Sequence, residues 1–308
     1  MIKVLILGHN GFIGKHLLNY FLQNSNLQIT ILSRNLNPLI PRQVHQIQGD
    51  YCNKEDLIAV MKNQDVVYHL ISATIPASSW FEPNDEVNQN LLPFIQFLQI
   101  ASDLNVKKVC FASSGGTVYG LQHNILTENT ANFPYSPYGI IKNAMEHFLY
   151  YFKKKSNLNY TIFRISNVYG EGQNVSKGLG FINTALQNIV HKKPIVIFGD
   201  GENIRDYIYI HDLVKLMYVG ISDGLEQSEI YNLGSTQVYS LNEIIELFKS
   251  LIHSNFELKY QDSRSSDIKK IVLDNSKIIS KMDADFSFTP IEAGILNTYN
   301  AIKKSIDN

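Results

Sequence analysis

Two residues with catalytic chemistry lie four apart near the middle of the chain. Tyr138 and Lys142 occupy a segment with helical periodicity, so their side chains project from the same face of one helix. An ammonium group near a phenol favours the phenolate and lowers the tyrosine pKa from about 10 towards neutrality. Such a tyrosine can act as general acid and base on a sugar hydroxyl. The spacing is weak by itself in a chain with 17 tyrosines, so its meaning depends on the surrounding elements.

A hydroxyl-rich segment precedes this helix and follows an apolar run. Residues 113–120 read Ser-Ser-Gly-Gly-Thr-Val-Tyr-Gly. Three of these hydroxyls, on Ser113, Ser114 and Thr117, come at the expected end of a strand. Polar groups at a strand end, followed by a tyrosine and lysine helix, strengthen the catalytic interpretation of Tyr138.

A glycine-rich loop near the N-terminus predicts a dinucleotide site. Gly8, Gly11 and Gly14 lie between a β-rich apolar run and an amphipathic helix. Glycine permits the tight turn and lets backbone N–H groups approach a pyrophosphate, which the positive end of the helix dipole then stabilises. The spacing is GxxGxxG. The residues expected to contact the dinucleotide are Gly8, Asn10, Gly11, Phe12, Ile13 and Gly14.

The end of the second expected strand bears on which dinucleotide binds. An acidic residue there would bind the ribose 2′-hydroxyl of NAD, but the chain has Ser33 and Arg34. This pair could accept the 2′-phosphate of NADP, or Arg34 could be a solvated loop residue. Asp50, at the end of the third strand, could hydrogen-bond the adenine or cap the next helix. NAD is the expected cofactor, with NADP left open.

Eight segments together resemble the extended short-chain dehydrogenases, and specifically the NAD-dependent epimerase/dehydratase family. The resemblance covers nearly the whole chain. It implies the activity of a nucleotide-sugar 4-epimerase such as UDP-glucose 4-epimerase. The segments are the three glycines of residues 8–14, and residues 113–120, 136–142, 164–170, 199–201, 205–212, 231–235 and 264–267.

The resemblance also implies roles for individual residues. Tyr138 would be the acid and base, Lys142 would hold the nicotinamide ribose, and Ser114 would bind the reacting hydroxyl. The family often has one fewer residue before Val-Tyr-Gly, so Ser113 and Thr117 remain rivals to Ser114, with Thr117 also a substrate contact. Asn90 matches a residue near the cofactor, although the Gly-Thr that usually follows is replaced by Pro93-Phe94.

The same resemblance implies a clamp for the substrate diphosphate. Asn167 would contact it, and Arg205 and Arg264 would hold its phosphates by bidentate guanidinium chemistry. Each has an alternative explanation: Arg205 could pair with the neighbouring Asp206, Arg264 with a nearby aspartate, and Asn167 could be a turn residue. His211 beside Asp212 suggests a triad, but Asp212 more plausibly caps a helix.

Three activities from different classes remain after this reading. An epimerase would oxidise the sugar at C4 and return the hydride to the other face. A 4-keto reductase of a nucleotide-linked deoxysugar would consume NADPH, which Ser33 and Arg34 favour. A non-catalytic dinucleotide sensor is disfavoured by the intact Tyr138 and Lys142. A 4,6-dehydratase usually carries Asp-Glu where this chain has Gly115-Gly116. We rank the epimerase first and the reductase second.

Composition excludes other classes of protein. The 308 residues are 44% hydrophobic and 18% charged with a net charge of -1, so neither a nucleic acid nor a membrane partner is expected. Cys52 and Cys110 form neither a disulfide framework nor a metal motif, and no metal is expected. No leader or membrane-spanning segment is recognised, which makes a cytoplasmic location the default expectation.

Alternating strands and helices in the first half must position these residues. Strands that are apolar on both faces and separated by helices predict an α/β fold, a doubly wound (Rossmann) parallel sheet. The expected strands are Ile2–Leu7, Leu27–Leu32, His45–Gln48, Asp65–Ser72 and Lys108–Ser113, and the expected helices are Phe12–Leu22, a helix capped by Asn53 and ending at Met61, and Asp85–Leu104.

The second half is less regular and predicts a smaller C-terminal α/β substrate-binding part. We expect a dinucleotide-binding domain over residues 1–170 and a substrate-binding part over 171–308, interleaved with it. Residues 72–83, with Thr74, Ser78, Ser79 and Trp80, are expected to line the sugar pocket. Family resemblance suggests a homodimer through the helices of residues 85–104 and 137–152. The remaining expected strands are Tyr160–Ile165, Ile195–Phe198, Asp206–Ile210, Ile230–Leu233 and Glu257–Tyr260, and the remaining helices are Pro137–Phe152, Phe181–His191, Leu213–Ile221, Leu241–Ile252 and Ile291–Ser305.

Overall fold

The computed structural model divides the chain into two compact units whose segments alternate along the sequence. It describes residues 1–24, 26–74, 80, 82–122, 125–175, 180–263 and 268–306. The expected boundary after residue 170 falls inside the second unit. The first unit comprises Met1–Gly120, Asn132–Arg164 and Val214–Tyr231, and the second comprises Leu121–Ala131, Ile165–Leu213 and Asn232–Asn308.

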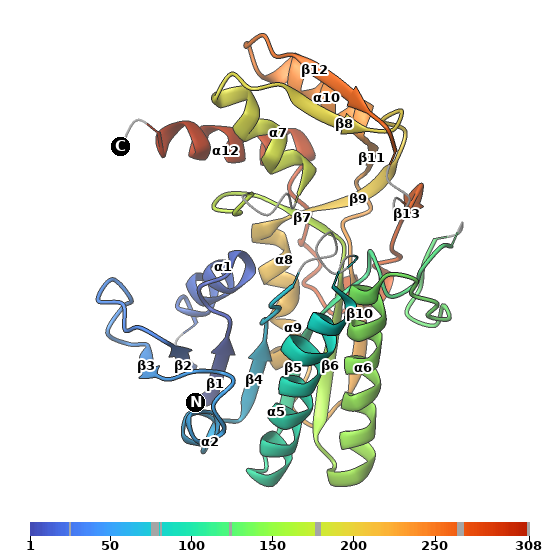
Figure 1. Cartoon of the computed structure of the whole chain (residues 1–308). Coiled ribbons are helices and arrows are strands. Elements are labelled where there is room, and N and C mark those ends of the chain that lie inside the picture. Colours follow the sequence, from blue (N-terminus) through green and yellow to red (C-terminus); the bar gives the residue numbers. More distant parts are fainter. Residues whose placement is uncertain are drawn as a thin grey trace. The chain divides into compact units, whose positions relative to one another are not determined.

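A seven-stranded sheet forms the centre of the first unit, in the order β10-β6-β5-β4-β1-β2-β3 (Figure 1). Its strands β5, β4, β1, β2 and β3 pair in parallel. The order 3-2-1-4-5-6 is that of a doubly wound dinucleotide-binding fold, so the predicted fold class is confirmed. The strands are β1 Ile2–Leu7, β2 Leu27–Ser33, β3 His45–Gln48, β4 Val66–His69, β5 Lys108–Ser114, β6 Asn159–Ile165 and β10 Glu229–Leu233.

Helices flank this sheet, and two of them begin at side-chain caps. Asn53 accepts from Asp56 N at 3.0 Å before α2, and Ser136 accepts from Gly139 N at 3.2 Å before α6. Pro137, at the first turn of α6, loses no hydrogen bond there. The helices are α1 Phe12–Phe21, α2 Lys54–Met61, α4 Pro83–Asp85, η1 Glu86–Leu91, α5 Leu92–Asp103, α6 Pro137–Ser156 and α9 Val219–Ser222, and α8 Ile210–Met217 passes from the second unit into the first.

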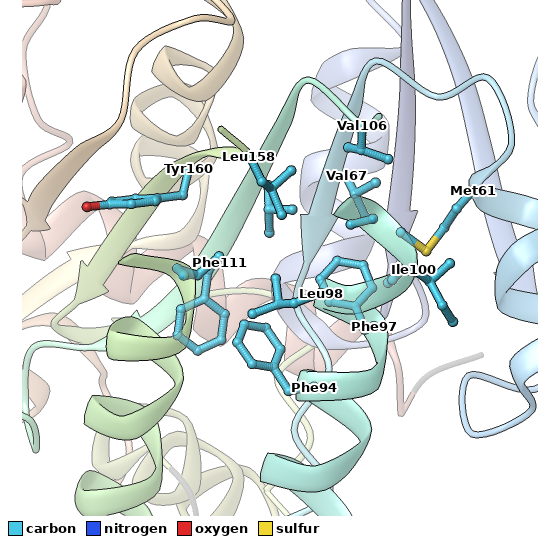
Figure 2. Packing of buried hydrophobic residues seen from close by; sticks show 14 of the residues in the cluster. Met61, Val67, Phe94, Phe97, Leu98, Ile100, Val106, Phe111, Leu158 and Tyr160 are labelled. Atoms are coloured by element: carbon cyan, nitrogen blue, oxygen red, sulfur yellow. The ribbon is translucent and has the colours of Figure 1, made fainter. Parts of the chain in front are cut away.

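A continuous apolar core lies between one face of the sheet and helices α2, α5 and α6. Figure 2 shows Phe94, Phe97 and Phe111 gathered around Leu98 in this layer. Phe94 and Phe111 have ring centroids 4.9 Å apart, a distance at which aromatic pairs attract beyond their area burial. This packing fixes α6 against β5 and thereby fixes the helix that carries Tyr138 and Lys142.

The prediction of one continuous α-helix over residues 85–104 is wrong, because the α-helical hydrogen bonding is interrupted. A π-helical segment, η1, separates α4 from α5. Pro93 explains the change, because proline has no N–H for a bond to the preceding turn and its ring crowds the carbonyl four residues earlier. The extra residue in the turn sets Glu86 and Asn90 inward, where both are buried.

The second unit contains a small sheet of order β11-β9-β13, with β7 paired to β9, and a two-stranded sheet of β12 and β8. The sequence did not predict the strands β7, β11 and β13 or the helix α11. Elements of two to four residues are too short to show a periodic pattern of apolar residues. Its elements are β7 Asn167–Tyr169, β8 Ile195–Phe198, β9 Ile204–Tyr209, β11 Val238–Ser240, β12 Leu258–Gln261, β13 Lys270–Ile271, α7 Phe181–Val190, α10 Leu241–Leu251, α11 Ser276–Ile279 and α12 Ile291–Lys304.

Two features of the described residues bear on possible partners. None of the helices there is both long and apolar enough to cross a membrane. Within the same residues, no cluster of three or more histidine, cysteine or acidic side chains could bind a metal ion. Cys52 is exposed and Cys110 is buried, and both are free thiols.

Candidate active site

The glycine loop has the backbone geometry that a dinucleotide requires. Gly8 has a φ of 90°, and a Cβ on Gly14 would lie 2.2 Å from the Gly8 carbonyl oxygen, so neither position tolerates a side chain. Gly11 occupies the N-cap position of helix α1, so the helix has no side-chain cap, and its first turn has no acidic residue. Its free N–H groups and positive dipole end therefore fit an anion such as a pyrophosphate.

The residues expected to choose between NAD and NADP lie beside this loop. Ser33 is buried and donates to the Asn35 carbonyl at 2.7 Å, while Asn10 approaches the Ser33 hydroxyl at 3.5 Å. Arg34 is exposed immediately after β2. Asp50 is also exposed, and one of its oxygens accepts from Cys52 N at 2.8 Å. The suggestion that Asp50 caps α2 is wrong, because Asn53 occupies that position.

Tyr138 and Lys142 lie one turn apart on α6, as predicted. The Lys142 ammonium is 5.6 Å from the centre of the Tyr138 ring and 4.8 Å from that of Phe111. It donates to the carbonyl oxygen of Ala112 in β5 at 2.9 Å. Lys142 is only 6% exposed, so this carbonyl and the two rings replace water around a buried cation.

Burial dominates the acid–base properties of this pair. It lowers the pKa of Lys142 to about 8, against the opposing effect of the Glu86 and Glu146 carboxylates. It raises the pKa of Tyr138 to about 12, with a hydrogen bond to Ser72 opposing the rise and Glu86 adding to it. The prediction that the Tyr138 pKa falls towards neutrality is therefore wrong for this structure, since desolvation of the phenol is the largest effect and raises the pKa.

The three candidate hydroxyls differ in their surroundings. Ser113 is buried and donates to Glu146 at 2.5 Å. Ser114 is partly exposed at the end of β5, and its carbonyl accepts from Thr117 N at 3.2 Å. The Thr117 hydroxyl is shielded from solvent and has no hydrogen-bond partner among the described residues.

Asn90 holds the chain that follows β4. Its carbonyl accepts from Ala73 N at 2.9 Å, and its amide donates to Thr74 at 2.8 Å and to Glu86 at 3.0 Å. Both amide protons are used in this way, so a role at the cofactor stays a prediction. Glu86 is 1% exposed, and its second oxygen has no partner within the part of the chain that the structure describes.

In the second unit, Asn167 and Arg205 share one face of the small sheet. Asn167 lies opposite Tyr207 in the parallel pair of β7 and β9, and Arg205 is two residues before Tyr207, so all three side chains are on the same face. Asn167 donates to the Asp206 carbonyl at 3.3 Å, and Arg205 to the Ile204 carbonyl at 2.9 Å. A guanidinium, an amide and a phenol on one face are suited to an anionic group.

Asp206 points to the opposite face from its neighbour Arg205, which argues against the local ion pair considered from the sequence. Its fully buried carboxylate accepts from Ser235 N at 2.9 Å. Burial raises the pKa of Asp206 to about 6, with backbone hydrogen bonds opposing the rise. Asp206 therefore joins two segments of the second unit.

The triad suggested by His211 and Asp212 is not supported. His211 lies 3.5 Å from Glu171, and the Asp212 carboxylate accepts from Thr289 N at 2.7 Å. Asp212 is in the first turn of α8 and so is not its cap. Two predictions fall outside the described residues: the phosphate role of Arg264, and Ser78 and Ser79 of the expected sugar pocket.

Residues 4–234 match the model of the NAD-dependent epimerase/dehydratase family. The chain belongs to this family. The dTDP-4-dehydro-6-deoxyglucose reductase of Escherichia coli is 30% identical over 292 residues, which cover 91% of each chain. This relative is a reductase, so membership of the epimerase/dehydratase family does not by itself fix the reaction.

Two solved structures of epimerases resemble the whole chain. The UDP-glucose 4-epimerase of Thermotoga maritima, solved with UDP-glucose, has a TM-score of 0.90 at 26% identity and covers 99% of this chain and 100% of its own. The UDP-glucuronic acid 4-epimerase of Bacillus cereus, solved with UDP-glucuronic acid and NAD, has a TM-score of 0.90 at 25% identity with the same coverage.

Sequence reasoning missed three residues of this site, Glu86, Glu146 and Tyr207, and it placed Ser72 in the expected sugar pocket without its hydrogen bond to Tyr138. Glu146 repeats the four-residue spacing of Tyr138 and Lys142 on α6, which is a signal that could have been used. Glu86 and the contact of Ser72 carried no signal, because only the π-helical turn and the end of β4 bring these residues to Tyr138. The phenol of Tyr207 is buried without a partner among the described residues and lies on the Arg205 face.

Proposed function

We propose that the protein is a nucleotide-sugar 4-epimerase that keeps NAD bound. The observation that carries the proposal is the pairing of Tyr138 with a Lys142 ammonium anchored on β5, beside a glycine loop built for a pyrophosphate. Solved epimerases that resemble the whole chain support the sugar nucleotide, and the one bound to NAD supports the cofactor.

The protein's part in this reaction is proton transfer at the phenol oxygen of Tyr138. That oxygen takes the proton of the sugar 4-hydroxyl and later returns it to the 4-keto oxygen. Lys142 favours the ionised phenol electrostatically and can hydrogen-bond the ribose of the nucleotide. When bound, NAD supplies the hydride acceptor and donor. Residues Gly8, Gly11 and Gly14 would hold its pyrophosphate.

The sugar nucleotide must stay anchored while its 4-keto sugar turns over. Arg205 and Asn167, on one face of the small sheet, offer the guanidinium and amide that suit a diphosphate. Arg264 would add a second guanidinium. The chain thus assigns the proton chemistry to its first unit and the phosphate contacts to its second.

The second candidate is an NADPH-dependent 4-keto reductase of a nucleotide-linked deoxysugar. Two observations favour it: the exposed Arg34 directly after β2, where a 2′-phosphate would lie, and the 30% identity to the Escherichia coli reductase. It would use the same tyrosine and lysine, with Tyr138 as the proton donor.

One experiment separates the two. Purified protein is denatured to identify any released nucleotide, and native protein is incubated with UDP-glucose or UDP-N-acetylglucosamine without added cofactor. Retained NAD and conversion to the 4-epimer, lost in Tyr138→Phe, would support the epimerase. Protein that binds NADPH, epimerises neither sugar and oxidises NADPH with a 4-keto sugar nucleotide would contradict it in favour of the reductase.

We also propose a homodimer through α5 and α6. Four apolar residues on these helices are about half exposed: Leu92 on α5, and Ile140, Tyr150 and Tyr151 on α6. Burying them against a second copy would remove this apolar area from water. Light scattering should give twice the chain mass for the wild type and the chain mass for Ile140→Glu with Tyr151→Glu. A monomeric wild type would refute the dimer.

A further inference from the structure

Lys142 and Glu146 of α6 hold two consecutive residues of β5. The Lys142 ammonium binds the Ala112 carbonyl at 2.9 Å, and one helical turn further on, Glu146 accepts from the Ser113 hydroxyl at 2.5 Å. The next residue of the strand is Ser114. The end of β5 is therefore tied at two points to the helix that carries Tyr138.

Glu146 is itself fixed from a second direction. Arg164 of β6 reaches its carboxylate at 2.7 Å, and both side chains are only 4% exposed. The guanidinium also lies over the Tyr119 ring, with its carbon 4.8 Å from the ring centre. Arg164 donates to both carboxylate oxygens, including the Oε1 that accepts from Ser113. Because a buried ion pair with several hydrogen bonds has little freedom to move, Glu146 presents Oε1 to Ser113 in one orientation.

These contacts distinguish the three candidate hydroxyls. Ser113 donates its only hydroxyl proton to Glu146, and the Thr117 hydroxyl is shielded from solvent. Ser114 follows Ser113 on a strand, so its side chain leaves the opposite face and does not approach Glu146. Its backbone is held in turn, since its carbonyl accepts from Thr117 N at 3.2 Å and from Val118 N at 3.1 Å.

We propose that Glu146 is a positioning residue which acts through Ser113 to set Ser114, the residue whose hydroxyl the family resemblance assigns to the reacting sugar hydroxyl. This inference rests on the proposed function, because it assigns parts within the same reaction. Glu146 contacts no reacting atom. Its effect is to hold the strand end so that the Ser114 hydroxyl keeps a fixed distance from the phenol of Tyr138, and misplacement of such a group by about 1 Å can cost 100-fold in rate.

The test is a set of variants measured for 4-epimerisation. Ser114→Ala should lower kcat by about 100-fold or more, since it removes a hydrogen bond to the reacting hydroxyl. Ser113→Ala should lower kcat by about 10-fold with KM and bound nucleotide unchanged. Thr117→Val should stay within about 3-fold of the wild type. A large loss in Thr117→Val with a small one in Ser114→Ala would overturn the assignment.

A double variant tests whether Ser113 acts through Ser114. If it does, Ser113→Ala should cause no further loss in the Ser114→Ala background, because the group it positions is already gone. Independent, multiplying losses would instead show that Ser113 supports the fold in general. Ser156→Ala is the matched control. It also removes one serine hydroxyl that donates a hydrogen bond to α6, here to the Phe152 carbonyl at 2.9 Å, and it should leave kcat unchanged.

Glu146→Gln strips Arg164 of its charge partner and can unfold the protein, so Ser113→Ala is the safer probe. Crystal structures of wild type and Ser113→Ala give a readout that needs no turnover. We expect the Ser114 oxygen to move by about 1 Å relative to the Tyr138 oxygen in the variant, with α6 unmoved. An unmoved Ser114 overturns the positioning role, whereas a wild type inactive on every sugar nucleotide would refute only the proposed reaction.

Discussion

The polar residues around Tyr138 and those around Arg205 are held in different ways. On α6, Lys142 and Glu146 are buried, bind neighbouring strands and have charged partners inside the same unit. On β9, Arg205 is partly exposed, and the adjacent carboxylate of Asp206 is used on the other face of the sheet. The groups proposed to move protons are thus preorganised in a buried layer, whereas the arginine proposed to bind the phosphates is partly exposed to solvent. We expect changes in the first region to alter kcat and changes in the second to alter KM.

Tyr138→Phe is the variant with the largest expected effect. Removing the phenol oxygen should lower kcat by about 100- to 10,000-fold and leave KM and bound nucleotide unchanged, because the group acts in the chemical step. Tyr150→Phe, on the exposed part of the same helix, is the control. If Tyr138→Phe kept more than a tenth of the wild-type kcat, the catalytic region would have been misidentified.

Lys142 should make stability depend on pH in the alkaline range. Its pKa is lowered from 10.5 to about 8 on folding. Between these values the unfolded chain binds the proton and the folded one does not, so stability rises with pH through this window by up to about 3 kcal/mol. The free energy of unfolding of wild type relative to Lys142→Met should increase by this amount from pH 8 to above 10.5. A constant difference would show that the ammonium is better solvated than its surroundings indicate.

Asp206 should act in the acid range and with the opposite sign. Folding raises its pKa from 3.8 to about 6. The folded state therefore binds the extra proton in this window, and the contribution present below pH 3.8 is lost as pH rises through 6, by up to about 3 kcal/mol. Denaturant unfolding should show wild type losing stability relative to Asp206→Asn over this range. Parallel pH profiles of the two proteins would argue against a buried, protonatable carboxyl.

Arg205→Met tests the binding side of the comparison and has the smallest expected effect. Loss of a charged hydrogen bond to a phosphate should raise KM for the sugar nucleotide by about 10- to 100-fold with kcat nearly unchanged. Arg205→Lys should recover part of the affinity, since it restores the charge without the bidentate fork. If Arg205→Met instead lowered kcat and left KM unchanged, the proposed division into a region that affects kcat and a region that affects KM would be refuted.

The sequence predicted the first region more completely than the second. Strands that are apolar on both faces, and a helical segment with Pro137 in its first turn, are signals that a local pattern carries. They correctly predicted the doubly wound sheet and the helix with Tyr138 and Lys142. The short strands β7, β11 and β13 form by pairing with distant segments, so the shared face of Asn167 and Arg205 had no local signal.

The sequence-based predictions around Tyr138 failed where the outcome depended on burial or on the exact hydrogen-bonding pattern of a helix. The Tyr138 pKa was expected to fall because a cation is near in sequence, but desolvation of the phenol is the larger effect. Pro93 was recognised as a departure from the family pattern, yet its consequence, a π-helical turn that buries Glu86 next to Tyr138 and Lys142, follows only from the packed helix. The choice among Ser113, Ser114 and Thr117 likewise depended on a carboxylate 33 residues from Ser113 in the sequence.

The alternation of the two units along the chain has a consequence for synthesis. Strand β10 pairs with β6 at one edge of the large sheet, but it is translated more than 60 residues after β6. Until it emerges from the ribosome, β6 presents an open edge whose seven residues are all buried in the finished protein. Such an edge can pair with another chain. Fragments that end before Glu229 should therefore aggregate, and production of the full chain should benefit from slow translation or a chaperone that covers β6.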